Sequence, residues 1–166
     1  MTLNRLADAF HDELQRILSS ERQQVESLPL MISTATCQKL KETLKEHLEA
    51  TMLHVQRVEK AFEDTARIPG SKKCQAMAGL LSEAEGVMQM ETDDDVMNAM
   101  LIASAQKVAH YEIASYGTLC TWADVLGYEH AKKFLAMNIA EEVAIDQKLT
   151  RLSVSTNKAA THHALT

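Results

Sequence analysis

Three glutamates occupy positions where an amphipathic helix normally carries an apolar residue. At 100° per residue, Glu21, Glu112 and Glu142 each continue the apolar stripe of a separate helical segment. A carboxylate in an apolar core is costly unless it is neutralised, paired or bound to a cation. Because three segments each direct one carboxylate inward, the pattern indicates that one bound partner neutralises all three. Metal ions held between helices are such a partner. We therefore predict a core metal site with these glutamates as ligands.

Two histidines and one aspartate are the candidate accessory ligands. His47 and His54 lie two turns apart along one face of the segment that has no inward glutamate, and Asp146 follows Glu142 by one turn. A mixture of carboxylate and imidazole groups suits iron, manganese or zinc. We expect these three residues to complete the ligand set.

The spacing of these residues is also compatible with a core that binds no metal. In standard di-iron bundles two helices carry Glu-x-x-His, whereas here Met52 stands three residues after Glu49 and Ile145 three after Glu142. An inward glutamate is also compatible with a boundary position whose carboxylate reaches water. Glu49 itself falls on a solvated face. Both a metal centre and a metal-free core are consistent with these residues.

The elements that position the candidate ligands are few and long. Apolar residues recur at helical spacing over about 3–28, 36–66, 74–90, 93–126 and 129–152. Pro29, Pro69-Gly70 and Gly127 separate these segments, and Asp93 is a helix start because its carboxylate can cap free N–H groups. Two helical hairpins are joined by roughly 25 residues that hold a short helix. This order predicts an all-α, ferritin-like four-helix bundle with a long crossover.

The amino-acid composition excludes several classes of protein. The chain has 166 residues, 46% hydrophobic and 4% aromatic, with five Gly and two Pro, which favours long helices over sandwiches and barrels. We expect one bundle domain over 1–154, followed by a disordered polar tail over 155–166. The net charge of −6 argues against nucleic acid as a partner. No apolar run approaches the ~20 residues that span a membrane.

The N-terminus and the cysteines predict the compartment. A helical pattern with acidic residues follows Met1 directly, unlike a signal peptide. Cys37, Cys74 and Cys120 are odd in number and widely spaced, as in a protein with reduced thiols. We expect a cytoplasmic protein.

Longer stretches of the sequence resemble a known family. The segment His110-Tyr111-Glu112-Ile113-Ala114-Ser115-Tyr116-Gly117-Thr118-Leu119 is similar to a stretch specific to the YciE/YciF family of bacterial ferritin-like stress proteins. Further similar segments extend the resemblance over about 6–152: Ser20-Glu21-Arg22-Gln23, His47-Leu48-Glu49, Lys73-Cys74, Gln106-Lys107-Val108, Glu141-Glu142 and Lys148-Leu149-Thr150. The resemblance implies a ferritin-like bundle, often dimeric, associated with bacterial stress responses. It also implies a carboxylate-lined site inferred to bind metal, without a firmly established reaction.

Two alanines depart from the family pattern. Family members commonly carry an acid at the position of Ala50 and another at that of Ala109, three residues before Glu112. Two divalent cations carry a total charge of +4. The four carboxylates of Glu21, Glu112, Glu142 and Asp146 carry −4 and only just balance it. A single metal ion, or none, is therefore as compatible with this sequence as a dinuclear centre.

Three functions are consistent with these features. The first is a stress-associated protein whose core binds iron, manganese or zinc, with oxidase or peroxide-consuming chemistry if bound iron cycles. The second is a structural dimeric scaffold that has lost the di-metal site, and the third is an adaptor for another protein. We expect a symmetric homodimer because small residues on one face of 93–126 permit close helix approach: Ala99, Ala103, Ala114 and Gly117.

Overall fold

The chain folds into five α-helices. A computed structural model describes residues 4–161, and its elements are α1 (Leu6–Thr34), α2 (Gln38–Asp64), α3 (Gln75–Met88), α4 (Asp94–Leu126) and α5 (Glu129–Thr161). No strand occurs within 4–161. The structure confirms the predicted all-α class and the order of two long hairpins around a short helix.

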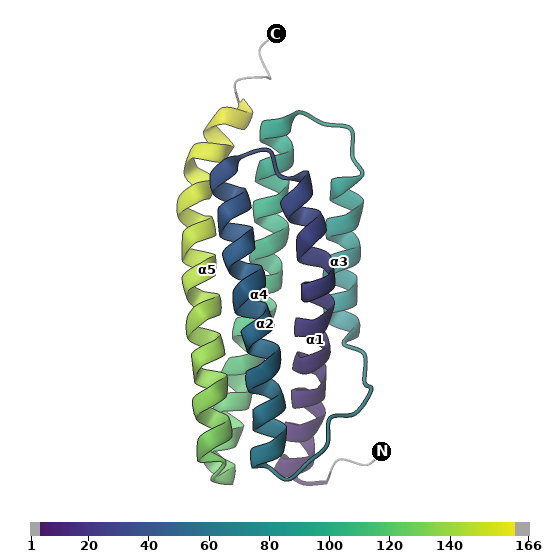
Figure 1. Cartoon of the computed structure of the whole chain (residues 1–166), viewed down its shortest axis with the longest axis vertical. Helices are drawn as coiled ribbons and strands as arrows, with labels where there is room; N and C mark the ends of the chain where they lie inside the picture. Colours follow the sequence, from purple (N-terminus) through teal and green to yellow (C-terminus); the bar gives the residue numbers. More distant parts are fainter. Residues whose placement is uncertain (1–3, 162–166) are drawn as a thin grey trace.

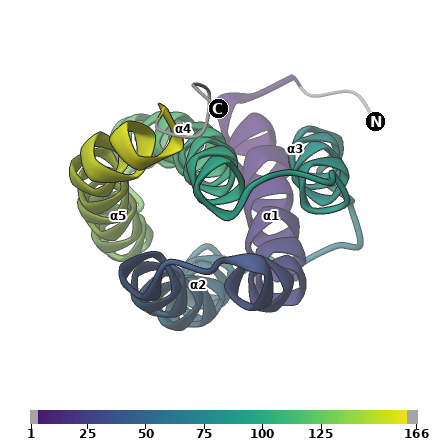
Figure 2. The same ribbon diagram turned by 90° about the horizontal axis from the view of Figure 1, so that it is seen from above.

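The four long helices form the bundle, and α3 lies outside it. Around the bundle the order is α1, α2, α5, α4, so that α1 neighbours both α2 and α4 (Figure 2). In Figure 1, α1 and α5 run upward while α2 and α4 run downward. The crossover from α2 to α4 therefore has to return along the length of the bundle. It does so through α3, which packs on α1 and α4.

Two apolar clusters fill the bundle, one toward each end. The lower cluster joins the first half of α1 to the end of α2 and the beginning of α5, and it includes Phe10, Leu14, Phe62, Leu119 and Leu135. The upper cluster joins the second half of α1 to the beginning of α2 and the beginning of α4, and it includes Leu28, Leu40, Leu44, Leu101 and Leu149. The stretches between them, near residues 21, 50, 112 and 140, form a middle layer that neither cluster contains. Five of the six predicted ligands fall in those stretches, and Asp146 follows Ile145 of the upper cluster.

Two helices extend beyond their predicted ends. The first continues through Pro29 to Thr34, although we expected Pro29 to bend or end it. Pro29 lacks one backbone donor, but Leu28 and Met31 on either side are buried in the upper cluster, and this packing holds the helix together.

The last helix continues to Thr161, so the expected tail is helical over 155–161. Thr156 is buried there, and its hydroxyl donates to the carbonyl of Leu152 over 3.1 Å. Residues 162–166 of that expected tail lie outside the described residues.

The turns between helices are held by specific side chains. Asp93 caps α4 by accepting a hydrogen bond from the amide of Asp95 at 2.9 Å, and Gly127 ends α4 in the left-handed region at φ 73°, as predicted. Asn98 of α4 is buried under the α1–α2 turn. Its Oδ1 accepts hydrogen bonds from the amides of Thr36 at 3.0 Å and Cys37 at 3.2 Å, so this side chain ties the first hairpin to the second.

The substitution Asn98→Ala is expected to lower the free energy of unfolding by about 2 kcal/mol, because it leaves two backbone donors of a tight turn without their acceptor. Urea unfolding followed by circular dichroism measures the change. Asn157→Ala, at an exposed position of α5, is the matched control and should change stability by less than about 0.5 kcal/mol. Equal effects of the two substitutions would contradict this role of Asn98.

Candidate metal centre

The three inward glutamates meet in the middle layer. Glu21 of α1, Glu112 of α4 and Glu142 of α5 each have no exposed surface. The remaining long helix, α2, contributes His47 and His54, which are also fully buried. Each helix of the bundle therefore places an ionisable side chain in one layer between the two apolar clusters.

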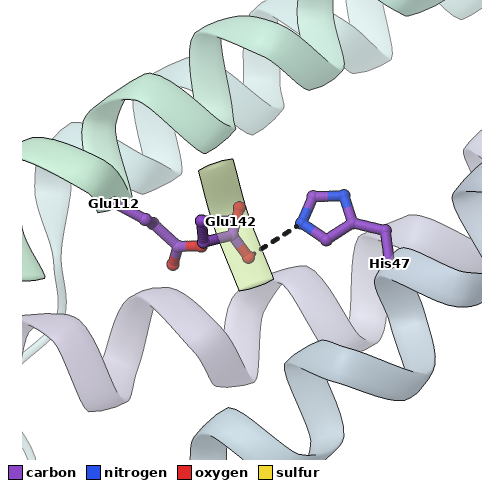
Figure 3. A group of neighbouring side chains, drawn as sticks. All are labelled: His47, Glu112 and Glu142. Atoms are coloured by element: carbon purple, nitrogen blue, oxygen red, sulfur yellow. Dashed lines mark hydrogen bonds and ion pairs between the residues drawn. The ribbon is translucent and has the colours of Figure 1, made fainter. Parts of the chain in front are cut away.

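The closest group consists of His47, Glu112 and Glu142. One ligand atom of each lies within 4.8 Å of the other two. His47 Nε2 is 3.2 Å from Glu142 Oε1, and Figure 3 shows the three side chains pointing toward one another from three helices. An imidazole and two carboxylates converging in this way form the donor set of a divalent-cation site.

Glu21 and His54 lie beside this group with partners of their own. Glu21 Oε1 accepts a hydrogen bond from the hydroxyl of Tyr116, which in turn accepts one from Asn138 Nδ2 at 2.9 Å. His54 Nδ1 is 3.3 Å from Glu21 Oε1 and 3.4 Å from Glu142 Oε1. The second nitrogen of His54 faces outward, 2.9 Å from Glu141 Oε2. His54 thus connects the buried carboxylates to the bundle surface.

Asp146 does not join the layer. Its side chain is 18% exposed, and its Oδ1 lies 3.3 Å from His110 Nε2 and accepts a hydrogen bond from Gln106 Nε2 at 3.0 Å. Four residues correspond to a rotation of about 40° beyond a full turn, which turns Asp146 away from Glu142 and toward the outer groove between α4 and α5. The structure therefore brings together five of the six predicted ligands, and Glu49 is exposed as expected.

Several polar residues of the layer escaped the sequence analysis as site residues. Asn138, Glu141 and Gln24 lie one turn or less from an inward glutamate, so helical spacing alone was the available signal. Arg57 Nη1 donates to Asn138 Oδ1 at 3.1 Å and to Glu141 Oε2 at 2.7 Å, which joins these side chains into one network. Tyr116, which donates to Glu21, lies one turn after Glu112, so the same spacing was its available signal.

Burial dominates the electrostatics of the glutamates. It raises the pKa of Glu21 well above the usual value, and the charge of Glu142 adds to the rise while the Tyr116 hydroxyl opposes it. Burial likewise raises the pKa of Glu112, together with the charges of Glu21 and Glu142, while contacts with the Gln24 amide and the Ser20 hydroxyl oppose the rise. By contrast, burial tends to raise the pKa of Glu141, but Arg57 and His54 outweigh it and lower that pKa.

Polar atoms without partners concentrate in the layer. Outside it, the buried side-chain atoms of the described residues that lack a hydrogen-bond partner are His11 Nε2 and Ser27 Oγ. Inside it there are seven: Glu21 Oε2, both amide atoms of Gln24, Nδ1 of His47 and His54, and Oε2 of Glu112 and Glu142. Native proteins rarely leave such atoms unsatisfied, so their convergence fits a site for a cation and its water ligands.

The fold and this layer define a ferritin-like four-helix bundle with buried carboxylates and histidines. The chain belongs to the family described as "Domain of unknown function (DUF892)", which matches residues 5–161. It is 39% identical to Protein YciF of Escherichia coli (strain K12), over 99% of this chain and all of that protein. These findings confirm the resemblance drawn from the sequence.

Solved structures agree with the family and the fold. The crystal structure of the E. coli stress protein YciF matches with a TM-score of 0.91 and 38% identity, over 94% of this chain and 99% of that one. YcfI, described as a putative structural protein from Rhodopseudomonas palustris, matches with a TM-score of 0.85 and 37% identity, over 89% and 94%. A protein of Xanthomonas campestris at 18% identity and a TM-score of 0.79, over 98% and 100%, shares the fold.

The raised pKa of Glu112 predicts that Glu112→Gln stabilises the metal-free protein at pH 7, by on the order of 1 kcal/mol. The amide keeps an oxygen for the Ser20 hydroxyl but carries no charge that burial, Glu21 and Glu142 would oppose. Urea unfolding in chelator-treated buffer measures the gain.

The gain should depend on pH with a definite sign. Below the unfolded pKa of about 4.3, Glu112 is protonated in both states and the two proteins should be equally stable. As pH rises from there toward the raised folded pKa of Glu112, the unfolded parent ionises first and the parent loses stability relative to the variant. Glu63→Gln, at an exposed position, is the control without this trend. A loss of more than about 1 kcal/mol in Glu112→Gln would show that the carboxylate accepts buried hydrogen bonds that outweigh its desolvation.

Proposed function

We propose that this chain is a bacterial stress-associated ferritin-like protein that binds a divalent cation, iron, manganese or zinc, in its middle layer. Glu112, Glu142 and His47 are the proposed ligands, with Glu21 and His54 beside them. The observation that carries the proposal is the convergence of buried carboxylate and imidazole groups on one level of the bundle, several of whose atoms have no hydrogen-bond partner. The stress association is taken from the description of the E. coli relative as a stress protein.

The chemistry of the donors supports such an ion. Imidazole and carboxylate groups are the common ligands of iron, manganese and zinc, and a divalent charge would offset the cost of burying the glutamates. A bound metal that cycles between oxidation states would supply oxidase or peroxide-consuming chemistry. The chain's own residues bind and orient the ion, and the apolar clusters on either side exclude bulk water. Asp146 is not among the proposed ligands, since it faces the outer groove.

A second candidate function is a structural scaffold. Ala50 and Ala109 stand where relatives of this family commonly carry acids, and one similar structure is described as a putative structural protein. Ala109 is fully buried against the layer. A chain that kept the bundle and lost metal chemistry would retain its apolar clusters and its Asn98 contacts, and it would bind no metal ion specifically.

We further propose a symmetric homodimer in the cytoplasm. Ala103 and Ala114 are exposed on α4, so a second helix can approach closely there. Gly117 supports this less, because a Cβ at that position would lie 3.7 Å from Ile139 of α5 in the same chain. No helix among residues 4–161 has the length and hydropathy needed to cross a membrane.

Metal binding predicts a measurable gain in stability. Protein purified without chelator or polyhistidine tag should contain metal by elemental analysis. At one hundred times the dissociation constant, the added ion should stabilise the parent by about 2.7 kcal/mol. Glu142→Gln should lose most of this gain, whereas Glu49→Gln on the exposed face of α2 should keep it. A metal-to-chain ratio near zero that iron, manganese and zinc all fail to raise would favour the scaffold.

The assembly can be tested by light scattering. At tens of micromolar the parent should have twice the chain mass of 18.5 kDa. Ala103→Arg combined with Ala114→Arg should give the monomer mass, because two cations would face their copies across the close contact. Ala136→Arg, on the exposed face of α5, is the matched control. A monomeric parent would rule out the dimer and leave the fold unaffected.

A further inference from the structure

We propose that Gln24 is a fourth protein ligand of this centre, and that each chain takes one divalent cation, held by Gln24, His47, Glu112 and Glu142. This inference rests on the metal-binding function proposed above and adds to it a ligand and a stoichiometry. Both come from the arrangement of partners in the middle layer.

Gln24 is a buried amide that interacts with the Glu112 carboxyl and whose oxygen has no hydrogen-bond partner among the described residues. Its side chain has no exposed surface. The neighbouring Gln23 shows the contrast, because its amide donates to Ser19 Oγ at 3.1 Å and to the carbonyl of Cys74 at 3.2 Å. A buried polar atom left unpaired costs about 1–3 kcal/mol. The oxygen of Gln24 is therefore available to bind a ligand.

The position of Gln24 directs it at the ligand group. It follows Glu21 by three residues, so both side chains lie on the same face of α1. The amide is also near enough to the Glu112 carboxyl to oppose the rise of its pKa. Gln24 thus brings α1 into the group that His47, Glu112 and Glu142 form from α2, α4 and α5.

Charge balance favours a single ion. The carboxylates of Glu112 and Glu142 carry −2 and offset one divalent cation, while the His47 imidazole and the Gln24 amide add ligand atoms without charge. The side chains left as ligands for a second cation would be Glu21 and His54. However, one oxygen of Glu21 accepts the Tyr116 hydrogen bond, and Nε2 of His54 is 2.9 Å from Glu141. One carboxylate cannot offset a second charge of +2 in a buried layer.

The donor types also define the class of ion. Amide and carboxylate oxygens suit hard cations, and a single imidazole nitrogen extends the range to borderline ones. Manganese(II), iron(II) and zinc(II) fit this set, whereas copper(I) prefers the thiolate and thioether sulfur that these four residues lack.

Calorimetric titration of the chelator-treated full chain with Mn²⁺ tests the inference. The parent should bind one ion per chain. Gln24→Leu should weaken Mn²⁺ binding by roughly tenfold or more, since even partners outside the ligand shell contribute that much. Without metal the same variant should melt at a higher temperature than the parent, because a buried amide whose oxygen has no partner has been replaced by an apolar group. A glutamine with only a structural role would give the opposite change in melting temperature and would leave Mn²⁺ affinity unchanged.

Two further variants make the outcomes distinct. Gln106→Leu is the matched control, because Gln106 bonds to Asp146 and Thr150 outside the layer, and it should keep the parent's Mn²⁺ affinity. Gln24→Glu retains a ligand oxygen and adds charge, so it should bind Mn²⁺ more tightly than the parent. If Gln24→Leu does not fold, this variant alone tests the ligand role of Gln24. Parental affinity in both Gln24 variants, or two ions per chain, would overturn the inference while leaving the metal-binding function standing. A parent that binds no Mn²⁺, Fe²⁺ or Zn²⁺ would instead overturn the proposed function itself.

Discussion

The cost of removing three carboxylates from water is the constraint around which this bundle is arranged. Glu21, Glu112 and Glu142 are fully buried, and no lysine or arginine forms an ion pair with any of them among the described residues. Burial of the apolar clusters on both sides of the layer stabilises the folded state and offsets the cost of burying these carboxylates. A cation bound in the layer would offset part of this cost.

The two sides of the layer are not equivalent. Around Glu112, the Ser20 hydroxyl donates at 2.9 Å and the Gln24 amide also interacts with the carboxyl, while Oε2 of Glu112 has no hydrogen-bond partner. Around Glu21, a chain of contacts leads from Tyr116 through Asn138 to Arg57, and from His54 to the partly exposed Glu141. The Glu21 side is therefore connected to the bundle surface through protein contacts. This asymmetry distinguishes the centre from a symmetric dinuclear arrangement, in which both sides contribute equivalent carboxylates and histidines.

Membership of a family described as a domain of unknown function places the chain among helical bundles but leaves the chemistry to be argued from its own residues. The E. coli relative is described as a stress protein and the R. palustris relative as a putative structural protein. In this chain Ala109, three residues before Glu112, is fully buried and adds no carboxylate to the layer.

Helical periodicity in the sequence was sufficient to determine the bundle, the crossover and the inward positions of the glutamates, because side-chain direction along a helix follows from residue spacing. It was insufficient for Asp146, Pro29 and the helical stretch over 155–161, where an offset of about 40° or the packing of neighbouring residues decides the outcome. Only the tertiary structure decided which donors meet. His54 has Glu141 at one nitrogen and Glu21 at the other, and Tyr116 donates to Glu21 and not to Glu112, because those contacts depend on the relative rotation and height of separate helices. Spacing within one helix carries no information about either quantity.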